Sequence, residues 1–578
     1  DLSQITMKAV LALFVAFVIL GVVAPSMAAP QAHPMSSKVL SGFARAFWGE
    51  EQAKELILSG KAPCIGCTLA IGVLEGMAIV HSESIDKTVA KICTILPSGL
   101  QPWCTGLIEI FGPTIIKMIE NKETPDRICN QLGLCTNPSC HLFPSPTLEH
   151  GKQEVAHPQH ETPKFEFYLP VADHLPLVDF DGDYHSTIME LRGYAWRGKD
   201  CDDWDAGVHP GRVPVKSGDD YTRDYNCNGI KGQNPQTGNS YEQDLCAGTN
   251  PVGVAILGDS AAAHFAIPPA WVTPSLINGH TYSDLLKILE DELDWPDMSS
   301  TTGYHVSSFN GNPGPQLSSI YKKNVERNKC AMRDFQNIGV NGARSGSMAS
   351  GIVQTLARNQ QTDVPLLINL ALIGNDVCNG HHDFNSMTTP QQMYENTMKT
   401  LRYLDANKIP KGSHLIMTGL ADGRVLYEGL SNRIHPLGSV RNDITYAQFY
   451  HYLNCMEASP CWGWMNNNAT VRNLTAVRQR ELNAVLEQIA NTEKFNNFDT
   501  IYLHDPFHAI IQKWTQGGGQ LYQLIEAVDG FHPSQQANAL IADYVWNLLE
   551  TQYPNFLPAL NPNNAKIQQI FGDQGGLN

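Results

Sequence analysis

The sequence predicts an α/β protein in which a parallel sheet is preceded by a small all-α, disulfide-bonded domain. Residues 251–550 alternate apolar, strand-like runs with helical segments, which is typical of a parallel sheet covered by helices. Residues 61–140 combine seven cysteines with helical periodicity, and so short a segment needs bridges because its own core is small. Residues 166–250 lie between the two parts and are rich in Asp, Asn and Gly.

The composition excludes several classes of protein. Of 578 residues, 42% are hydrophobic and 17% are charged, which fits about two to four globular domains and excludes a disordered chain or a coiled coil. With a formal net charge of −17, the chain lacks the basic footprint of a nucleic-acid binder, so we expect no nucleic-acid partner. The even number of cysteines, 14, indicates disulfides and an oxidising compartment.

The N-terminus predicts secretion. A basic residue at Lys8, an apolar run over 9–24 and small residues up to Ala28 indicate a leader and signal peptide over residues 1–28. The alternative is a membrane anchor, but the run is shorter than the ~20 residues that span a bilayer. We expect residues 29–60 to be a propeptide or leader. Glycosylation sequons at Asn468 and Asn473 agree with secretion.

The first six cysteines have a nearly symmetric spacing. Successive members are 3, 26, 11, 25 and 6 residues apart, and amphipathic segments such as 68–80 and 107–120 lie between them. This pattern resembles the saposin family over residues 61–140. Spacing alone leaves the pairing open. The resemblance implies the bridges Cys64–Cys135, Cys67–Cys129 and Cys93–Cys104.

Saposin-like domains are helical leaves that open and present an apolar face to lipid. The resemblance therefore implies transient contact with a membrane or micelle surface. The alternative is that the same side chains fill the core of the small domain. The side chains available for such a face are Ile65, Leu69, Ile71, Val73, Leu74, Met77, Ile79, Ile108, Ile110, Phe111, Ile115, Ile116 and Ile119.

Cys140 is a seventh cysteine of this region, and an odd cysteine in a secreted domain indicates a bridge to another part of the chain. Residues 141–165 are rich in Pro, His and polar residues, which predicts an exposed, cleavable linker. The bridge would keep the small and large fragments joined after cleavage. The large part has seven more cysteines with open pairing; zinc is the alternative, but they contain no Cys-x-x-Cys pair.

The acidic segment, residues 166–250, predicts bound calcium. Alternating aspartates at 179–183 are followed by an aspartate cluster at 200–205 and by a loop at 224–230. That loop has oxygen side chains at positions 1, 3 and 5 and Gly at 6, as in a calcium loop. The alternative is a solvated acidic surface. The expected ligands of structural Ca2+ are Asp179, Asp181, Asp183, Asp203, Asp205, Asp224, Asn226, Asn228 and Ile230.

A candidate nucleophile follows the first apolar run of the α/β region. The run VGVAIL at 252–257 leads into Gly-Asp-Ser at 258–260 and a helix-like segment. A serine at a strand-to-helix turn places its hydroxyl at the carboxyl end of the sheet and its N–H at a helix N-terminus, where that N–H can stabilise an oxyanion. Ser260 would be weakly nucleophilic until a base takes its proton.

Three later blocks supply the other groups that acyl transfer requires. A turn contains Gly342, an apolar run ends in Gly-Asn-Asp with Asn375, and Asp-Gly-Phe-His runs from Asp529 to His532. Histidine has the near-neutral pKa that suits a general base. An aspartate three residues earlier can orient the imidazole and stabilise its cation.

The order of these blocks resembles the SGNH, or GDSL-type, hydrolases over about 300 residues. The resemblance implies a flavodoxin-like parallel sheet in a hydrolase domain at 251–578 and a Ser–His–Asp mechanism with Ser260, His532 and Asp529. It places the oxyanion donors at the backbone N–H groups of Ser260 and Gly342 and at the Asn375 side chain.

Three polar residues beside these motifs have weaker claims to a role. We expect His264 and Asp376 to pack or cap the neighbouring elements. For Arg344, which follows the Gly342 turn, a phosphate contact and a surface salt bridge both stay open.

The combination of a signal peptide, a saposin-like domain, a linker, an acidic segment and an SGNH domain resembles the acyloxyacyl hydrolase family along nearly the whole chain. The resemblance implies removal of secondary fatty acyl chains from the lipid A of bacterial lipopolysaccharide, which detoxifies it. It also implies phospholipids as further lipid partners and a secreted enzyme that reaches lysosomes or endocytic vesicles. The alternatives are a general secreted phospholipase or acyltransferase, or a non-catalytic lipid carrier.

Overall fold

The computed structural model describes residues 56, 59, 61–97, 101–135, 139–144, 174–213, 221–305, 317–378 and 380–578. The predicted signal peptide, almost all of the predicted propeptide and the predicted linker from residue 145 onward lie outside the described residues.

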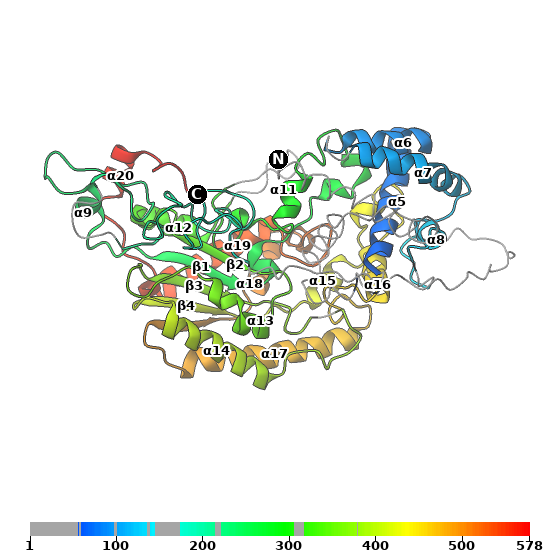
Figure 1. Ribbon diagram of the computed structural model, residues 1–578. Coiled ribbons are helices and arrows are strands. Elements are labelled where there is room, and N and C mark those ends of the chain that lie inside the picture. The colour runs from blue at the N-terminus through cyan, green and yellow to red at the C-terminus, as the bar shows by residue number, and fades with distance from the viewer. Residues whose placement is uncertain are drawn as a thin grey trace.

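A five-stranded parallel sheet forms the centre of the large part (Figure 1). Its order, β2-β1-β3-β4-β5, is the flavodoxin-like order of a doubly wound sheet, so the predicted fold class is confirmed. Strands buried on both faces read as continuous apolar runs, and all six residues of β1 are buried. The strands are β1 (Gly253–Gly258), β2 (Phe335–Gly339), β3 (Leu366–Ala371), β4 (Ser413–Thr418) and β5 (Phe498–Leu503).

Helices cover both faces of this sheet (Figure 1). On one face, α13 (Ser345–Ser350), α14 (Pro390–Asn407) and α17 (Ala469–Thr492) share a buried cluster with β1 and β3. On the other face, α12 (Ile320–Arg327) and α19 (Gln535–Gln552) share a second cluster with the strands. The sheet is therefore the middle layer of three.

Shorter helices complete the large part. They are α9 (Tyr241–Cys246), α10 (Ser260–Ala263), α11 (Leu285–Glu290), α15 (Arg424–Leu430), α16 (Tyr446–Cys455), α18 (Pro506–Gln516) and α20 (Asn564–Phe571). They surround the sheet: α15 and α16 lie on the side of the small domain, and α9 and α20 lie at the opposite end of the large part (Figure 1).

The small domain is all-α and disulfide-bonded, as predicted. It consists of α5 (Lys61–His81), α6 (Ile85–Ile92), α7 (Gln101–Glu120) and α8 (Pro125–Gln131). Its bridges join the pairs that the saposin resemblance implies, so this pairing is confirmed: Cys64–Cys135, Cys67–Cys129 and Cys93–Cys104.

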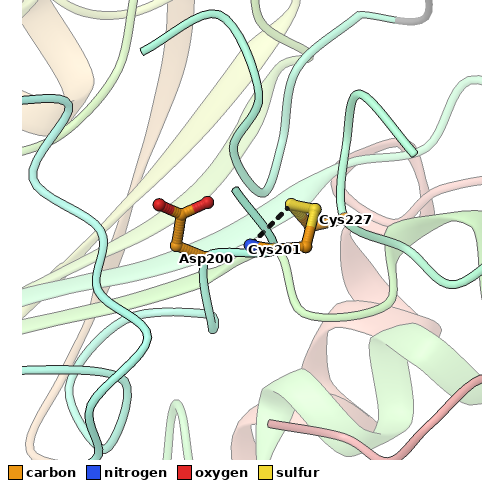
Figure 2. A group of neighbouring side chains, drawn as sticks. All are labelled: Asp200, Cys201 and Cys227. Carbon is orange, nitrogen blue, oxygen red and sulfur yellow. Dashed lines mark hydrogen bonds between the residues drawn. A yellow bond between two sulfur atoms is a disulfide. The ribbon is translucent and has the colours of Figure 1, made fainter. Parts of the chain in front are cut away.

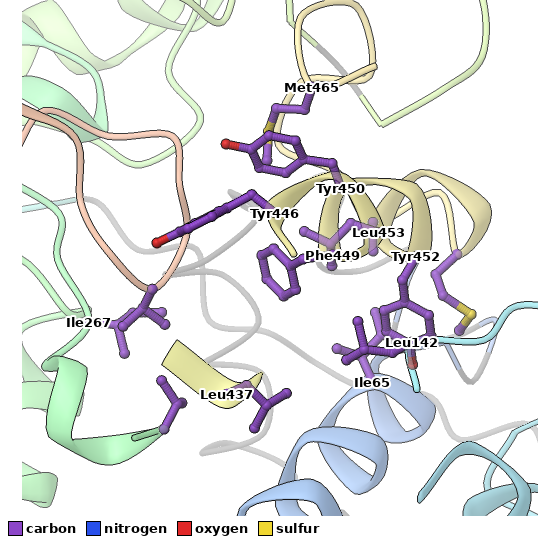
Figure 3. Close-up of a cluster of buried hydrophobic side chains, with 14 of the residues drawn as sticks. Ile65, Leu142, Ile267, Leu437, Tyr446, Phe449, Tyr450, Tyr452, Leu453 and Met465 are labelled. Atoms are coloured by element: carbon purple, nitrogen blue, oxygen red, sulfur yellow. The ribbon is translucent and has the colours of Figure 1, made fainter. Parts of the chain in front are cut away.

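Helix α5 packs against the large part. Ile65 on α5 lies with Leu142 and with Tyr452 of α16 in one buried cluster (Figure 3). Two glycines allow this close approach. A Cβ atom at Gly72 would lie 2.3 Å from the ring of Phe143, and one at Gly76 would lie 2.4 Å from Pro274. The two domains thus share a continuous apolar core.

This packing differs from the expected open, lipid-facing surface. The large part covers the apolar face of α5 because α16 supplies its own apolar side chains to the same cluster. Helix α5 is long and apolar enough to cross a membrane, yet 67% of its most apolar window is buried, as in a packed core helix. Only the end of α5 is open, where Ile79 is 50% exposed. The buried members of the predicted face are Ile65, Ile71, Val73, Met77 and Ile115.

The small domain is tied to the large part covalently. Cys140 pairs with Cys455, 315 residues later, so the unmatched cysteine of the small domain does find a partner elsewhere in the chain. The backbone N–H groups of Leu142 and Phe143 each donate to the buried Asp126 carboxylate at 2.9 Å. Residues 141–144 are therefore packed, and a linker could begin only after them.

The remaining cysteines are also paired. They form Cys201–Cys227, Cys246–Cys330 and Cys378–Cys461, and none of the cysteines, all of which lie within the described residues, is free. The zinc alternative thereby loses its thiolate ligands.

Replacing both Cys140 and Cys455 with Ser should destabilise the protein by about 2–4 kcal/mol, because the bridge constrains a long loop in the unfolded chain. The measurement is the unfolding temperature by calorimetry. The matched control is the Cys93→Ser/Cys104→Ser variant, whose bridge spans 11 residues and whose loss should be smaller. An equal loss for the two variants would contradict the expectation.

Candidate functional site

Ser260 lies at a tight turn between β1 and α10. Gly258 ends β1, and a Cβ atom there would lie 2.4 Å from Ala262, so only glycine fits. The turn is fixed by Asp259, whose Oδ1 accepts from the N–H of Ala261 at 3.1 Å and whose Oδ2 accepts from the N–H of Ile373 at 2.8 Å. Burial raises the pKa of Asp259 to about 6, and the two N–H donors partly offset this by stabilising the carboxylate.

His532 and Asp529 meet Ser260 from the other end of the chain. The Ser260 hydroxyl lies 2.7 Å from Nε2 of His532, and Nδ1 of His532 lies 2.6 Å from Oδ2 of Asp529. The other Asp529 oxygen accepts from the N–H groups of Phe531 at 2.8 Å and His532 at 3.1 Å. All three predicted residues therefore form one buried hydrogen-bonded chain.

The loop that carries His532 is braced by α16. Gly530 has a φ of 63°, which favours glycine, and a Cβ atom there would lie 2.7 Å from the Tyr450 hydroxyl. That hydroxyl donates to the Gly530 carbonyl at 2.6 Å. The orientation of the imidazole thus depends on the same helix that packs against the small domain.

Gly342 and Asn375 lie on the turns that flank Ser260, as their positions after β2 and β3 require. Gly342 has a φ of 74°, a conformation that favours glycine. The Asn375 side chain lines the same recess as Ser260 and donates one amide hydrogen to the Ala343 carbonyl at 3.1 Å. Its second amide hydrogen remains available to a bound group.

An apolar recess opens beside Ser260. It has about 460 Å³ of atom-free space, part of which is open to solvent. Its polar residues are Asp259, Ser260, Asn375 and His532, so an apolar chain could lie in the recess with its ester group at the Ser260 hydroxyl. The apolar lining residues are Ala261, Ile373, Ala421, Leu426, Trp464, Phe507, Phe531 and Pro533.

The weaker candidates serve the structure around the site. His264 Nδ1 accepts from Asn538 at 2.9 Å, and burial lowers the pKa of His264 to about 3, so it stays neutral. Asp376 is buried and accepts hydrogen bonds from Ser345, as expected of a capping residue. Arg344 donates to the backbone carbonyls of Ser386 and Cys378; these contacts do not test a phosphate contact or a salt bridge.

The first acidic loops bring carboxylates together. Asp179, Asp181 and Asp203 form one group, and Asp181, Asp183 and Asp200 form another. One oxygen each of Asp181, Asp183 and Asp200 is buried without a hydrogen-bond partner. Burial and neighbouring carboxylates raise the pKa of Asp183 to about 8 and that of Asp200 to about 7. Unpaired, buried carboxylate oxygens are the ligands that a hard cation takes, so these residues fit calcium.

Two residues differ from the predicted ligand set here. Asp200 joins the cluster although it was not among the expected ligands, since only the fold turns it toward Asp183. Asp205 does not join it. Its carboxylate accepts from the Gly207 N–H at 3.1 Å and pairs with Arg223 at 2.8 Å, which satisfies it on the outer side of the loop.

The loop at 224–230 closes on itself and on a glutamate. The Asp224 carboxylate accepts from the N–H groups of Asn228 and Gly229. The side-chain amides of Asn226 and Asn228 both reach the buried Glu242 carboxylate, at 3.1 and 3.0 Å. Glu242 lies outside the loop pattern, so spacing gave no signal for it. Ile230 is buried behind the loop and donates its N–H to Asn228.

A third group is not a metal site. Asp200 lies beside Cys201 and Cys227, but the two sulfur atoms are bonded to each other and the N–H of Cys201 donates to Cys227 Sγ (Figure 2). This bridge joins the two acidic loops and so fixes their separation.

Comparison with known proteins gives matches to both parts. Residues 63–160 match the family model of the saposin-like domain, and residues 254–545 match that of the GDSL-like lipase/acylhydrolase. The chain is 41% identical over 558 residues to acyloxyacyl hydrolase of Mus musculus and 40% identical over 560 residues to that of Homo sapiens. Each match covers 91% of this chain and 95% of the relative. Saposin-C of Cavia porcellus is 26% identical over 53 residues, 9% of this chain and 65% of that protein.

Proposed function

The chain belongs to the acyloxyacyl hydrolase family, and on that premise we propose that it removes secondary fatty acyl chains from the lipid A of bacterial lipopolysaccharide, which detoxifies it. As a member of this family with a GDSL-type domain it is a lipid acyl-ester hydrolase. The observation that carries the proposal is the Ser260–His532–Asp529 chain at the edge of an apolar recess.

The geometry supports a Ser–His–Asp mechanism. His532 takes the Ser260 proton as Oγ attacks the ester carbonyl carbon, and Asp529 stabilises the imidazolium that forms. The oxyanion accepts hydrogen bonds from the N–H groups of Ser260 and Gly342 and from Asn375. When the tetrahedral intermediate collapses, His532 returns the proton to the leaving alkoxide. A water molecule then repeats the sequence on the acyl-enzyme and releases the fatty acid.

The recess favours a lipid over a polar substrate. Its side chains are aliphatic or aromatic away from the hydroxyl, so a fatty acyl chain is desolvated on binding while its ester remains beside Ser260. Phospholipids present the same acyl-ester chemistry, and a general phospholipase or acyltransferase is the second candidate. A carrier without catalysis would have no use for a buried, fully connected Ser–His–Asp chain.

We further propose that calcium is structural. Asp179, Asp181, Asp183, Asp200 and Asp203 would hold it in the first loops. In the second loop the proposed ligands are Asp224, Asn226, Asn228 and Ile230, with Glu242 beside them; there the carboxylates accept hydrogen bonds from the loop itself. Calcium would neutralise repelling carboxylates and fix the loops, and it has no part in the reaction steps.

The proposed location is extracellular or in endocytic vesicles and lysosomes. Seven disulfides are typical of an oxidising compartment, and the sequon residues Asn468 and Asn473 are exposed. Cleavage after residue 144 would leave small and large fragments joined through Cys140 and Cys455.

Wild-type protein incubated with lipopolysaccharide should release the secondary, non-hydroxylated fatty acids, and Ser260→Ala should release none, because the nucleophile is lost. Mass spectrometry of the released acids is the measurement, and Ser439→Ala, which removes an exposed serine hydroxyl, is the control. Release from phospholipid vesicles alone would favour the second candidate. Full release by Ser260→Ala would rule out this nucleophile.

Asp529→Asn should lower kcat by about 10⁴-fold, because the imidazole then takes the wrong tautomer. Hydrolysis of a soluble chromogenic ester measures kcat without an interface. The matched control is Asp499→Asn, since the Asp499 side chain is 77% exposed. A loss below tenfold at an unchanged unfolding temperature would contradict the role given to Asp529.

Removal of calcium should lower the unfolding temperature, and more at pH 8 than at pH 5. The raised pKa values of Asp183 and Asp200 mean that without a cation the folded protein keeps protons that the unfolded chain has lost above about pH 4. Stability without calcium therefore falls as the pH rises to about 8, and a bound cation replaces those protons. Calorimetry with calcium or with a chelator tests this. An unfolding temperature independent of calcium at pH 8 would count against the site.

A further inference from the structure

The two proposed oxyanion donors besides Ser260 stand on separate turns. β1 lies between β2 and β3, and the last paired residues are Gly258 with Gly339 and Gly258 with Ala371. Beyond these residues the sheet no longer sets the distance between the Gly342 and Asn375 turns. That distance matters, because each donor has to lie about 3 Å from the oxyanion.

Asp376 connects these turns. Its carboxylate is completely buried. Oδ1 accepts from the Ser345 hydroxyl at 2.7 Å and from the Thr388 hydroxyl at 2.6 Å, and the Ser345 N–H lies 3.0 Å from Oδ2. Ser345 begins α13, three residues after Gly342, while Asp376 directly follows Asn375. The connection therefore starts and ends beside the two donors.

Two neutral acceptors make further links between the same turns. Asn375 donates to the Ala343 carbonyl at 3.1 Å, and Arg344 donates to the Cys378 carbonyl at 2.6 Å. A hydrogen bond with an ionised donor or acceptor is shorter and roughly twice stronger than a neutral one, which applies to both Arg344 and Asp376. Asp376 accepts from two hydroxyl groups and one N–H group at once, so it is the link with the most contacts between the turns.

We propose that Asp376 is a positioning residue, whose buried carboxylate holds the Gly342 turn against the Asn375 turn and so sets the separation of the two donors beside Ser260. The inference rests on the proposed function, since that function makes the turns donors. Asp376 does not line the recess and acts only through Gly342 and Asn375.

The test is the kinetics of Asp376→Asn. In this variant an amide group replaces an oxygen that faces the N–H or the hydroxyl of Ser345, so the turns move apart. We expect kcat to fall by about 10- to 100-fold, less than the loss of a whole donor, with KM changed less than threefold. The assay uses the same soluble chromogenic ester, so that contact with a lipid surface does not enter.

A double-mutant cycle separates positioning from simple destabilisation. Because Asp376 acts partly through Asn375, Asp376→Asn should cost less in an Asn375→Ala background than in the wild type. Equal losses in both backgrounds would overturn the proposal, as would a raised KM with unchanged kcat. If Asp376→Asn does not fold, Ser345→Ala replaces it, with an expected loss in kcat of several-fold at a near wild-type unfolding temperature; no loss in kcat would again overturn the role.

The matched control is Asp334→Asn. Asp334 is also buried and pairs with Arg358 at 2.7 Å at the opposite end of β2, so its loss should lower the unfolding temperature and leave kcat unchanged. A fall in kcat as large as that of Asp376→Asn would mean that any buried charge has this effect. Ser260→Ala in the same assay tests the proposed function separately. Ser260-dependent hydrolysis that is insensitive to Asp376→Asn overturns the positioning role alone.

Discussion

The site depends on the register of three parallel strands. Gly258 pairs with Gly339 on one side and with Ala371 on the other, so β1, β2 and β3 end at the same level of the sheet. Ser260, Gly342 and Asn375 each follow one of these ends by a few residues. A shift of one strand would move one group by about 3.3 Å, which exceeds the tolerance of a hydrogen bond. The glycines at the strand ends protect this register, because a side chain at Gly258 or Gly339 would collide with α10.

The small domain contacts α16, the helix that braces the loop carrying His532. Tyr452 of α16 packs on α5. Tyr450 lies on another face of the same helix and donates to the backbone of the loop that carries His532. The ion pairs Arg441–Glu75 and Lys61–Glu457 and the Cys140–Cys455 bridge act on the same boundary. Helix α16 therefore lies between α5 and the loop that carries His532. Lipid contact by the small domain has to use surface other than the covered face of α5.

Features that depend on a short stretch of residues could be predicted from the sequence, whereas contacts between distant stretches could not. The strand-turn-helix at Ser260 and the Asp529–His532 pair are local, because each motif sets its own backbone. Asp200 and Glu242 were not in the predicted ligand set because the spacing patterns at 179–183 and 224–230 do not include them, and the fold brings them beside Asp183 and Asn226. Asp205 has a suitable spacing, yet Arg223 pairs with it. The apolar residues of α5 predict a covered face, but the sequence does not distinguish a face covered by lipid from one covered by the large part.

Two of the motifs contain an aspartate that takes no part in the proposed reaction: Asp259 in Gly-Asp-Ser and Asp376 in Gly-Asn-Asp. Asp259, before Ser260, ties the β1 turn to the β3 turn through the Ile373 N–H. Asp376, after Asn375, ties the β3 turn to the β2 turn through Ser345. Together they connect the turns after β1, β2 and β3 at the carboxyl ends of these strands, beyond the last paired residues of the sheet. Burying a carboxylate is costly, as the raised pKa of Asp259 shows. In return, a buried carboxylate makes stronger hydrogen bonds than a neutral side chain and so holds the turns more firmly. This matters for a site in which several donors have to be fixed around one oxygen.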